Sequence, residues 1–471
     1  MLNYFPKYFT SNAIYLYVGT LILVSIVFFS YAMNWYWFVF GLVAVVGFFY
    51  FSNSLTKKWS CITSKVFTKK VFITALILRI VWVVFSYFFY TAMTGQPFDF
   101  GAADAMGYNL CGEEIAAELR AGNWNIFSIY LDLMGPSDFG YMSYLGMLYY
   151  IVGDSIIIVR LIKALLSAFS VVLIYRLTSR SFGEQAGRIA AIFCMLMPNL
   201  IYYTGSHLKE TEMIFLVIAF FERADHAMRS AKFSFSNLVL PLLIAGSLFF
   251  FRTILGATVL FSFFTALMFS NKRVLKKGWK RGVLIIWALV TVIYFMGGKI
   301  SMEVEEAWQN REGSQKNMIE WRANREGGNR FAKHGSAVFF APMIFVLPFP
   351  TMLEIPNQEN MRLLHGGYFV KNVMAFFAMF ALLWILTKKK WRDYLLVGSF
   401  TLSYLLVIAL SPFAWAERFH LPALPFELML GAFGVTQLTN KSKKYYNYYL
   451  IFVFCIVVGW SWFKLAGRSF I

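Results

Sequence analysis

Apolar stretches long enough to cross a lipid bilayer recur along the whole chain, and short segments rich in lysine and arginine join them. A spanning helix needs about 20 predominantly apolar residues, and this length predicts about thirteen spans here. A chain of this kind folds as an all-α polytopic membrane protein, because helices satisfy their own backbone hydrogen bonds within lipid. The predicted spans cover residues 13–31, 33–51, 71–92, 156–177, 187–204, 209–222, 236–251, 253–270, 282–297, 368–387, 393–410, 420–437 and 446–464.

Composition supports this fold class and bears on the partners. The chain is 59% hydrophobic and 14% charged, whereas soluble proteins average about 45–50% apolar and about 25% charged residues. The formal net charge of +19 would indicate nucleic-acid binding in a soluble protein. Here the basic residues fall in short loops between apolar runs, where membrane orientation explains them better. We therefore expect membrane lipids, and no nucleic acid, as partners.

The basic loops also predict the orientation of the chain. Lysine and arginine concentrate in residues 52–70, 271–281, 388–392 and 441–444. All these loops fall on the cytoplasmic side if the N-terminus is cytoplasmic and the C-terminus is outside. The first apolar run lacks a small-residue cleavage site, so we expect no cleaved signal peptide. The sequence thus predicts a multi-pass protein of the bacterial inner membrane whose long segments 93–155 and 298–367 face outside.

Three apolar segments are irregular for a membrane protein. The run 236–270 is too long for one span, and Arg252 interrupts it, which predicts a tight hairpin with Arg252 at the turn. The apolar stretch 337–353 contains three prolines, so we expect a re-entrant or surface segment there. The apolar stretch 141–152 is too short to span and should lie along the membrane surface.

The chain is predicted to divide into four regions. They are two extra spans and a basic loop in 1–70, a transmembrane core with a first outer loop (93–155) in 71–297, a second outer loop in 298–367, and C-terminal spans in 368–471.

The first outer loop carries an unusual concentration of acidic residues. Asp104 is followed by Tyr108 four residues later, and then by Glu113 and Glu114. Carboxylates at the outer lipid surface suit general-base chemistry on a substrate held there. Asp104 with Glu113 or Glu114 also offers hard oxygen ligands that a divalent cation would accept, although the sequence requires no cofactor.

Further polar residues lie at the predicted outer ends of separate helices. Charges at membrane depth are expensive and usually functional, and arginines beside carboxylates suit a substrate with a phosphate and a hydroxyl group. Simpler explanations exist: Arg160 and Lys163 reaching towards headgroups, Glu210 favouring a helix dipole, and the histidines forming local hydrogen bonds. Arg79, inside a span, is expected to be a structural partner or to reach the interface. The candidate residues are Arg160, Lys163, His207, Lys209, Glu210, Arg252, Arg418 and His420.

The order of these features resembles the GT-C superfamily of membrane glycosyltransferases. The resemblance is nearest to the branch of protein O-mannosyltransferases and aminoarabinose transferases. It rests on Asp104 and Tyr108 before a small-residue helix, on the run from Arg160 to Glu210, on Arg252-Thr253 in a helix hairpin, and on Glu417-Arg418-Phe419 before Pro422. Two spans precede the helix that normally comes first, and the acidic residue that opens the fourth helix appears as Lys209-Glu210.

The resemblance implies an enzyme that transfers a sugar, with inversion, from a polyprenyl-phosphate-linked donor to a glycan, lipid or protein acceptor. Asp104 is then the expected base, with Glu113, Glu114 and Glu210 as further catalytic carboxylates. Arg160, Arg252 and Arg418 would stabilise the departing phosphate. The remaining substrate-binding candidates are Tyr108, Lys163, His207, Lys209 and His420. Two alternatives stay open: a lipid-linked saccharide flippase or transporter, which would more often show inverted repeats, and a polysaccharide polymerase or ligase.

Overall fold

All regular structure in the described part of the chain is helical. The computed structural model contains eighteen α-helices there, and no β-strand occurs among the described residues. The structure describes residues 2–229, 236–270, 311–324, 328–331, 341–356, 358–411 and 413–468, with isolated positions between 282 and 309.

Six described helices are long and apolar enough to cross a membrane. They are α1 (Lys7–Val27), α2 (Trp35–Lys58), α3 (Ser64–Thr94), α7 (Ile156–Phe182), α16 (Glu359–Thr387) and α20 (Ser442–Ala466). Shorter apolar helices accompany them: α11 (Ser236–Phe251), α12 (Thr253–Phe269), α17 (Leu395–Ala409) and α19 (Leu424–Thr436).

The predicted multi-pass membrane protein is therefore confirmed, whereas the count of thirteen spans stays a prediction. The predicted span 282–297 and much of the second outer loop lie outside the described residues. The other helices are α4 (Ala103–Arg120), α5 (Ile126–Met134), α6 (Pro136–Val152), α8 (Glu184–Leu196), α9 (Pro198–Tyr202), α10 (Glu210–Arg229), α14 (Arg311–Asn324) and α18 (Glu417–His420).

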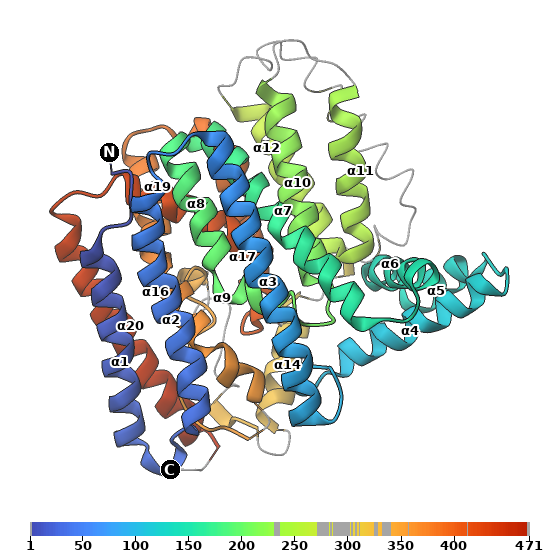
Figure 1. Cartoon of the computed structure of the whole chain (residues 1–471), viewed down its shortest axis with the longest axis horizontal. Helices are drawn as coiled ribbons and strands as arrows, with labels where there is room; N and C mark the ends of the chain where they lie inside the picture. The colour runs from blue at the N-terminus through green and yellow to red at the C-terminus, as the bar shows by residue number, and fades with distance from the viewer. Residues whose placement is uncertain are drawn as a thin grey trace.

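The two N-terminal helices pack against the C-terminal part of the chain. Helix α1 contacts α20, and α2 contacts α16 and α8, so the ends of the sequence lie side by side at one edge of the bundle (Figure 1). The phenol of Tyr446 on α20 donates a hydrogen bond to the Phe9 carbonyl at 2.9 Å. The extra N-terminal spans thus complete the bundle rather than form a separate unit.

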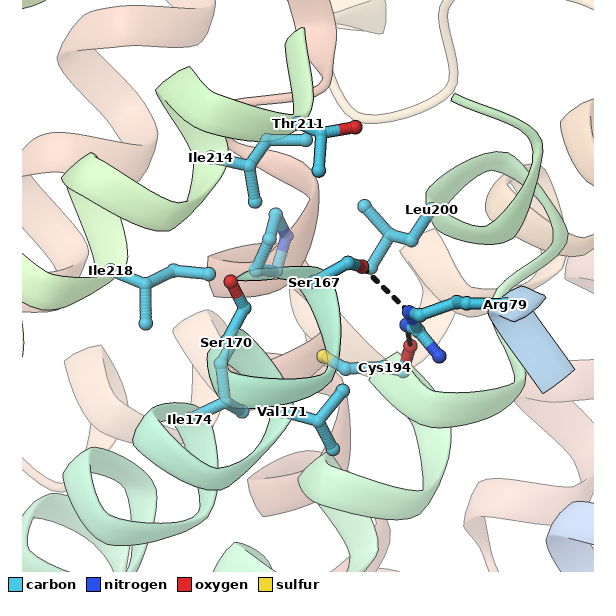
Figure 2. Close-up of a pocket in the computed structure, with 11 residues that line it drawn as sticks. Arg79, Ser167, Ser170, Val171, Ile174, Cys194, Leu200, Thr211, Ile214 and Ile218 are labelled. Carbon is cyan, nitrogen blue, oxygen red and sulfur yellow. Dashed lines mark hydrogen bonds between the residues drawn. The ribbon is translucent and has the colours of Figure 1, made fainter. Parts of the chain in front are cut away.

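Residues 187–204 do not form one helix, contrary to the sequence prediction, because the chain breaks at Pro198. Proline has no N–H, so the Cys194 carbonyl, four residues earlier, lacks its helical partner. The Arg79 guanidinium on α3 takes that place. It donates to the Cys194 carbonyl at 3.2 Å and to the Ser167 hydroxyl at 2.6 Å (Figure 2). It also donates to the Met195 carbonyl at 3.3 Å. Arg79 is fully buried and is a structural partner, the first of its two expected roles.

The first outer loop forms a helical arm that projects sideways from the bundle. Helices α4 and α6 pack against each other, and α5 covers the far end of the arm (Figure 1). Leu133 and Ile151 on the arm are each 73% exposed. Helix α6 covers the stretch 141–152 that the sequence predicted to lie along the membrane surface.

The apolar segment after residue 340 is buried from Phe345 to Leu353 but forms no spanning helix over the described residues 341–353. Two neighbouring side chains of α16 hold its backbone. The Lys371 ammonium donates to the Leu347 carbonyl at 2.5 Å, and the Asn372 amide donates to the Val346 carbonyl at 2.6 Å. Buried polar backbone needs such partners; the predicted re-entrant or surface segment stays a prediction.

Candidate active site

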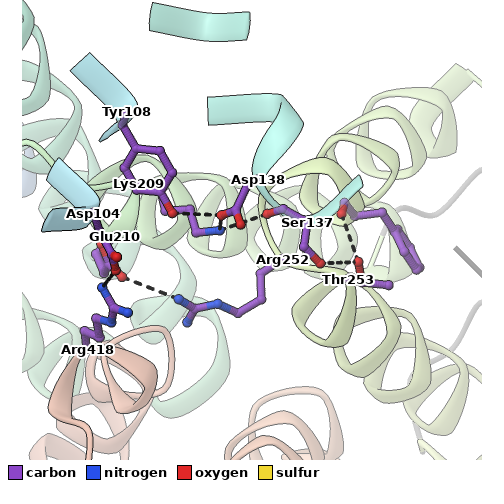
Figure 3. Close-up of polar contacts among 10 residues, drawn as sticks. Asp104, Tyr108, Ser137, Asp138, Lys209, Glu210, Arg252, Thr253 and Arg418 are labelled. Carbon is purple, nitrogen blue, oxygen red and sulfur yellow. Dashed lines mark hydrogen bonds and ion pairs between the residues drawn. The ribbon is translucent and has the colours of Figure 1, made fainter. Parts of the chain in front are cut away.

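Residues far apart in sequence meet where four segments come together: the first turn of α4, the start of α10, the turn between α11 and α12, and α18. Figure 3 shows Asp104, Glu210, Arg252 and Arg418 converging from these segments. All four were predicted site residues. The turn at Arg252 separates α11 from α12, so the predicted hairpin is confirmed.

Asp104 and Arg418 form an ion pair at the exposed edge of this group. The carboxylate accepts a hydrogen bond from the guanidinium Nη1. The side chains of Asp104 and Arg418 are 49% and 35% exposed, so both can meet a substrate. Asp104 is the only acidic residue in the first turn of α4.

Glu210 and Arg252 form a second, deeper pair beside the first. The Nη2 of Arg252 donates to Glu210 Oε1 at 3.4 Å, and their side chains are only 11% and 2% exposed. The second carboxylate oxygen of Glu210 and the Nη1 of Arg252 are buried without a hydrogen-bond partner among the described residues. Buried polar groups are normally paired, so this pair has unused capacity for a polar ligand.

The ring of Phe419 lies against both arginines. The guanidinium carbon of Arg252 is 4.2 Å from the ring centroid, and that of Arg418 is 5.3 Å away. Phe413 stacks on Phe419 with centroids 4.1 Å apart and an angle of 9° between the rings. Phe419 belongs to the Glu417-Arg418-Phe419 run that carries the resemblance, but no role was predicted for its ring.

A second polar group adjoins the first through the N-terminus of α6. Lys209 is ion-paired with Asp138 and donates to the Ser137 carbonyl at 2.8 Å, and the Tyr108 phenol donates to Asp138 at 2.8 Å. The hydroxyl groups of Ser137 and Thr253 are 2.7 Å apart. Asp138 of α6 therefore contacts both Tyr108 of α4 and Lys209, which directly precedes α10 (Figure 3).

Asp138 was not among the predicted site residues. Burial alone would raise the pKa of its carboxyl, but the Lys209 ammonium and the hydrogen bonds from Lys209 and Tyr108 bring that pKa below its ordinary value. The sequence signal was weak: an acidic residue in the first turn of a helix opened by Gly135-Pro136, which a helix dipole alone explains.

Two predicted carboxylates lie apart from this centre. Glu113 accepts a hydrogen bond from Asn109 at 2.8 Å, and Glu114 accepts one from Tyr130 of α5. Neither forms an ion pair with a residue of the centre. Among the described residues, no group of three or more His, Cys, Asp or Glu side chains could hold a metal ion. The proposed cation at Asp104 and Glu114 thus has no ligand set in the described part of the chain.

Three predicted binding residues lie buried behind the centre. Arg160 donates to the Pro97 carbonyl, Lys163 is 3.4 Å from Glu212, and the His207 ring is 3.2 Å from the Tyr149 phenol. Each is 0% exposed. Arg160 and His207 contact the linker between α3 and α4 through Pro97 and Phe98, whereas Lys163 also bonds the Leu208 carbonyl.

Asp99 in that linker is another buried acid. Its Oδ1 has no hydrogen-bond partner among the described residues. Burial raises the pKa of Asp99 to about 6, and the Arg160 guanidinium opposes this rise only in part. Burial, with the nearby charges of Lys163 and Arg160, also holds the pKa of His207 well below its ordinary value.

Helix α18 is anchored by residues on either side of Arg418. The Glu417 carboxylate accepts hydrogen bonds from Asn199 at 2.5 Å and from Tyr203 at 2.6 Å. Burial raises the pKa of Glu417 to about 7. The buried ring of His420, another predicted binding residue, is 2.8 Å from the Ala414 carbonyl. These contacts fix the helix and leave Arg418 at the open edge.

Comparison with known proteins adds a family to this geometry. Residues 127–307 match the model of the Alg9-like mannosyltransferase family, which is one of the GT-C membrane glycosyltransferase families. The matched segment is less than half of the chain and includes Asp138, Lys209, Glu210 and Arg252, whereas Asp104 lies outside it. No curated protein sequence matches the chain.

The match confirms the prediction of a glycosyltransferase and supports the GT-C resemblance at the level of the superfamily. The narrower branch of protein O-mannosyltransferases and aminoarabinose transferases stays a prediction.

Proposed function

We propose that this membrane glycosyltransferase transfers a mannosyl residue from a polyprenyl-phosphate-linked donor to a hydroxyl group of a lipid-linked glycan, with inversion at the anomeric carbon. One observation carries the proposal: Asp104 and Glu210 lie among Arg252 and Arg418 at one place, where α4, α10 and α18 meet. A base and a pair of phosphate-binding cations are what such a transfer needs. The family match supports mannose as the sugar.

In the proposed reaction, the acceptor hydroxyl attacks the anomeric carbon from the face opposite the lipid phosphate. Asp104 takes the hydroxyl proton as the new carbon–oxygen bond forms. The bond from the anomeric carbon to the phosphate oxygen breaks, and its electron pair leaves with the polyprenyl phosphate. A general base typically contributes about 10²–10⁴-fold to such a rate.

Arg252 and Arg418 would stabilise the departing phosphate. Arginine binds phosphate oxygens through two parallel N–H donors, and fixed charges act strongly where water is scarce. In the structure Arg418 pairs with Asp104. When the phosphate takes that guanidinium, the Asp104 carboxylate becomes free to accept the proton, so donor binding prepares the base.

Lys209, Asp138 and Tyr108 hold the centre together rather than react. Tyr108 lies one helical turn after Asp104, and Lys209 directly precedes Glu210. Their shared partner Asp138 therefore fixes the distance between the two proposed catalytic segments. Glu210, which pairs with Arg252, has the proposed role of orienting that guanidinium and the acceptor.

The test is transfer by the purified full-length protein in detergent or nanodiscs. Tritiated mannose on polyprenyl phosphate is incubated with a glycolipid acceptor extract, and the label is followed into the glycolipid. Donors carrying glucose or galactose should be used at least tenfold more slowly. Absence of transfer, together with movement of the labelled lipid between vesicle leaflets, would favour the transporter alternative.

A further inference from the structure

The Phe419 ring occupies a distinctive place in the centre. It has Arg252 within 4.2 Å and Arg418 within 5.3 Å, while Phe413 stacks on it at 4.1 Å. A cation within about 6 Å of a ring centroid is attracted by the electron-rich face, and the attraction grows when water is excluded. The side chain of Arg252 is 11% exposed, which meets that condition.

The contact leaves donors of the Arg252 guanidinium available, although the Tyr404 hydroxyl lies close enough to interact with it. Stacking on a ring engages the flat face of a guanidinium, whereas its five N–H donors point outward in the plane. One of these nitrogens makes a 3.4 Å contact with Glu210, and the buried Nη1 has no hydrogen-bond partner among the described residues. An aromatic ring can thus hold a buried cation without consuming the groups that bind an anion.

We infer that Phe419 is a positioning residue for the lipid phosphate, which holds the Arg252 guanidinium by its face so that the N–H edge stays free for phosphate oxygens. This inference rests on the proposed function of the site. The stack of Phe413 on Phe419 fixes the ring, and the ring in turn fixes the guanidinium. Phe419 itself touches no phosphate oxygen, so it acts through Arg252.

An electronic test separates this role from simple packing. Fluorine atoms withdraw electron density from the ring face while changing its shape little. The full chain is prepared with phenylalanine, 4-fluoro-, 3,5-difluoro- or 3,4,5-trifluorophenylalanine at position 419. Binding of farnesyl phosphate, a short polyprenyl monophosphate, is measured by calorimetry in detergent. We expect the dissociation constant to rise stepwise with each fluorine, about tenfold over the series, or about 1.4 kcal/mol.

The same series at Phe193 is the matched control. Phe193 is a buried ring of α8 that packs on Phe5 and Phe48, so its fluorination should change the affinity by less than about twofold. A second set uses natural residues: Phe419→Tyr keeps an aromatic face and should bind farnesyl phosphate like the parent, whereas Phe419→Leu should bind about tenfold more weakly. Thermal unfolding of each variant shows that it is folded.

The outcomes also separate this inference from the proposed function. If fluorination at 419 leaves the affinity unchanged while Arg252→Ala loses binding, the phosphate site stands and the role of Phe419 is overturned. If Arg252→Ala binds farnesyl phosphate like the parent, the phosphate site itself is wrong, and both proposals fall. A stepwise loss at 419 with no loss at 193 supports the inference.

Discussion

Asp104, in the first turn of α4, is ion-paired with Arg418 of α18, 314 residues later in the chain. The pair brings the first outer loop to the C-terminal third of the bundle. Because Glu417 is held by Asn199 and Tyr203, the position of Arg418 depends on the helix break at Pro198 as well. The proposed base and its cation are thus placed by three separate parts of the chain.

Replacement of Asp104 tests the proposed base. Asp104→Asn keeps the shape of the side chain but cannot accept a proton, so we expect the turnover number to fall at least about 10²-fold. Transfer of labelled mannose is the measurement. Glu114→Gln is the control, because that carboxylate lies on the same helix but accepts a hydrogen bond from Tyr130; equal losses in both variants would remove Asp104 from its assigned role.

Replacement of Arg252 tests the phosphate contact. Arg252→Lys keeps the charge but loses the two-pronged geometry, so donor use should be impaired, and Arg252→Ala should be worse. The expected change is a rise in the donor Michaelis constant of about tenfold for Lys and more for Ala. Arg120→Ala, which breaks an exposed pair with Asp154, serves as the control and should behave like the parent.

Asp99 should make stability depend on pH. Its pKa in the folded protein is about 6, above the ordinary value of 3.8, so between these values the folded state keeps a proton that the unfolded chain releases. The associated stability is present below about pH 4 and is lost as the pH rises through about 6. The amide side chain of the Asp99→Asn variant cannot ionise. At pH 7.5 the free energy of unfolding of this variant should therefore exceed that of the parent by about 1–3 kcal/mol, and the variant should unfold at a higher temperature.

That difference should shrink as the pH falls and approach zero near pH 3, below the ordinary pKa of 3.8, when thermal unfolding is followed in detergent. Asp154→Asn is the comparison, since Asp154 is 45% exposed and paired with Arg120 at the surface. A gap between Asp99→Asn and the parent that is the same at both pH values would contradict the argument.

Arg79 should matter for stability and not for catalysis. Arg79→Gln removes donors from the carbonyls of Cys194 and Met195, and each buried carbonyl left unpaired costs about 1–3 kcal/mol. The melting temperature should fall by several degrees, while the folded protein transfers mannose at close to the parental rate. Arg223→Gln should leave the melting temperature nearly unchanged, because the Arg223 side chain that pairs with Glu222 is 47% exposed. A large loss of turnover in folded Arg79→Gln would argue against a purely structural role.

Orientation in the membrane is tested by single cysteines in a background without Cys61, Cys111, Cys194 and Cys455. Ala121→Cys, exposed at the end of α4, should react with an impermeant maleimide added to intact cells. Lys443→Cys, exposed at the start of α20, should react only after the membrane is opened. The reverse pattern would put the proposed site in the cytoplasm.

The sequence predicted much of the architecture because lipid imposes strict rules on it. Apolar length revealed the spans, and Arg252 within an apolar run revealed the turn between α11 and α12. The break at Pro198 was missed because the apolar character of the sequence continues across it. In the structure the helix ends before Pro198, and the Arg79 side chain bonds the carbonyls left without helical partners. Periodicity held further information: with about 100° per residue, Tyr108 lies about 40° from Asp104 around α4, while Glu113 lies about 180° away.

The site was only partly predictable for a different reason. Asp104, Glu210, Arg252 and Arg418 could be named singly as charges at one face of the membrane. Their pairing depends on how α4, α10 and α18 pack, which no local pattern encodes. Asp138 and Phe419 were missed because an acidic residue at a helix start and a phenylalanine in an aromatic-rich chain are ordinary features until their neighbours are known.

The ion pair between Asp104 and Arg418 has one more consequence. In the proposed mechanism the Asp104 carboxylate and the donor phosphate compete for the Arg418 guanidinium. The measured donor affinity is therefore lower than the affinity of a site whose Arg418 is unpaired. Neutralising the carboxylate should relieve the competition. The Asp104→Asn protein, although slow in turnover, should therefore bind farnesyl phosphate more tightly than the parent, and a weaker affinity in calorimetry would show that the carboxylate and the phosphate do not compete for Arg418.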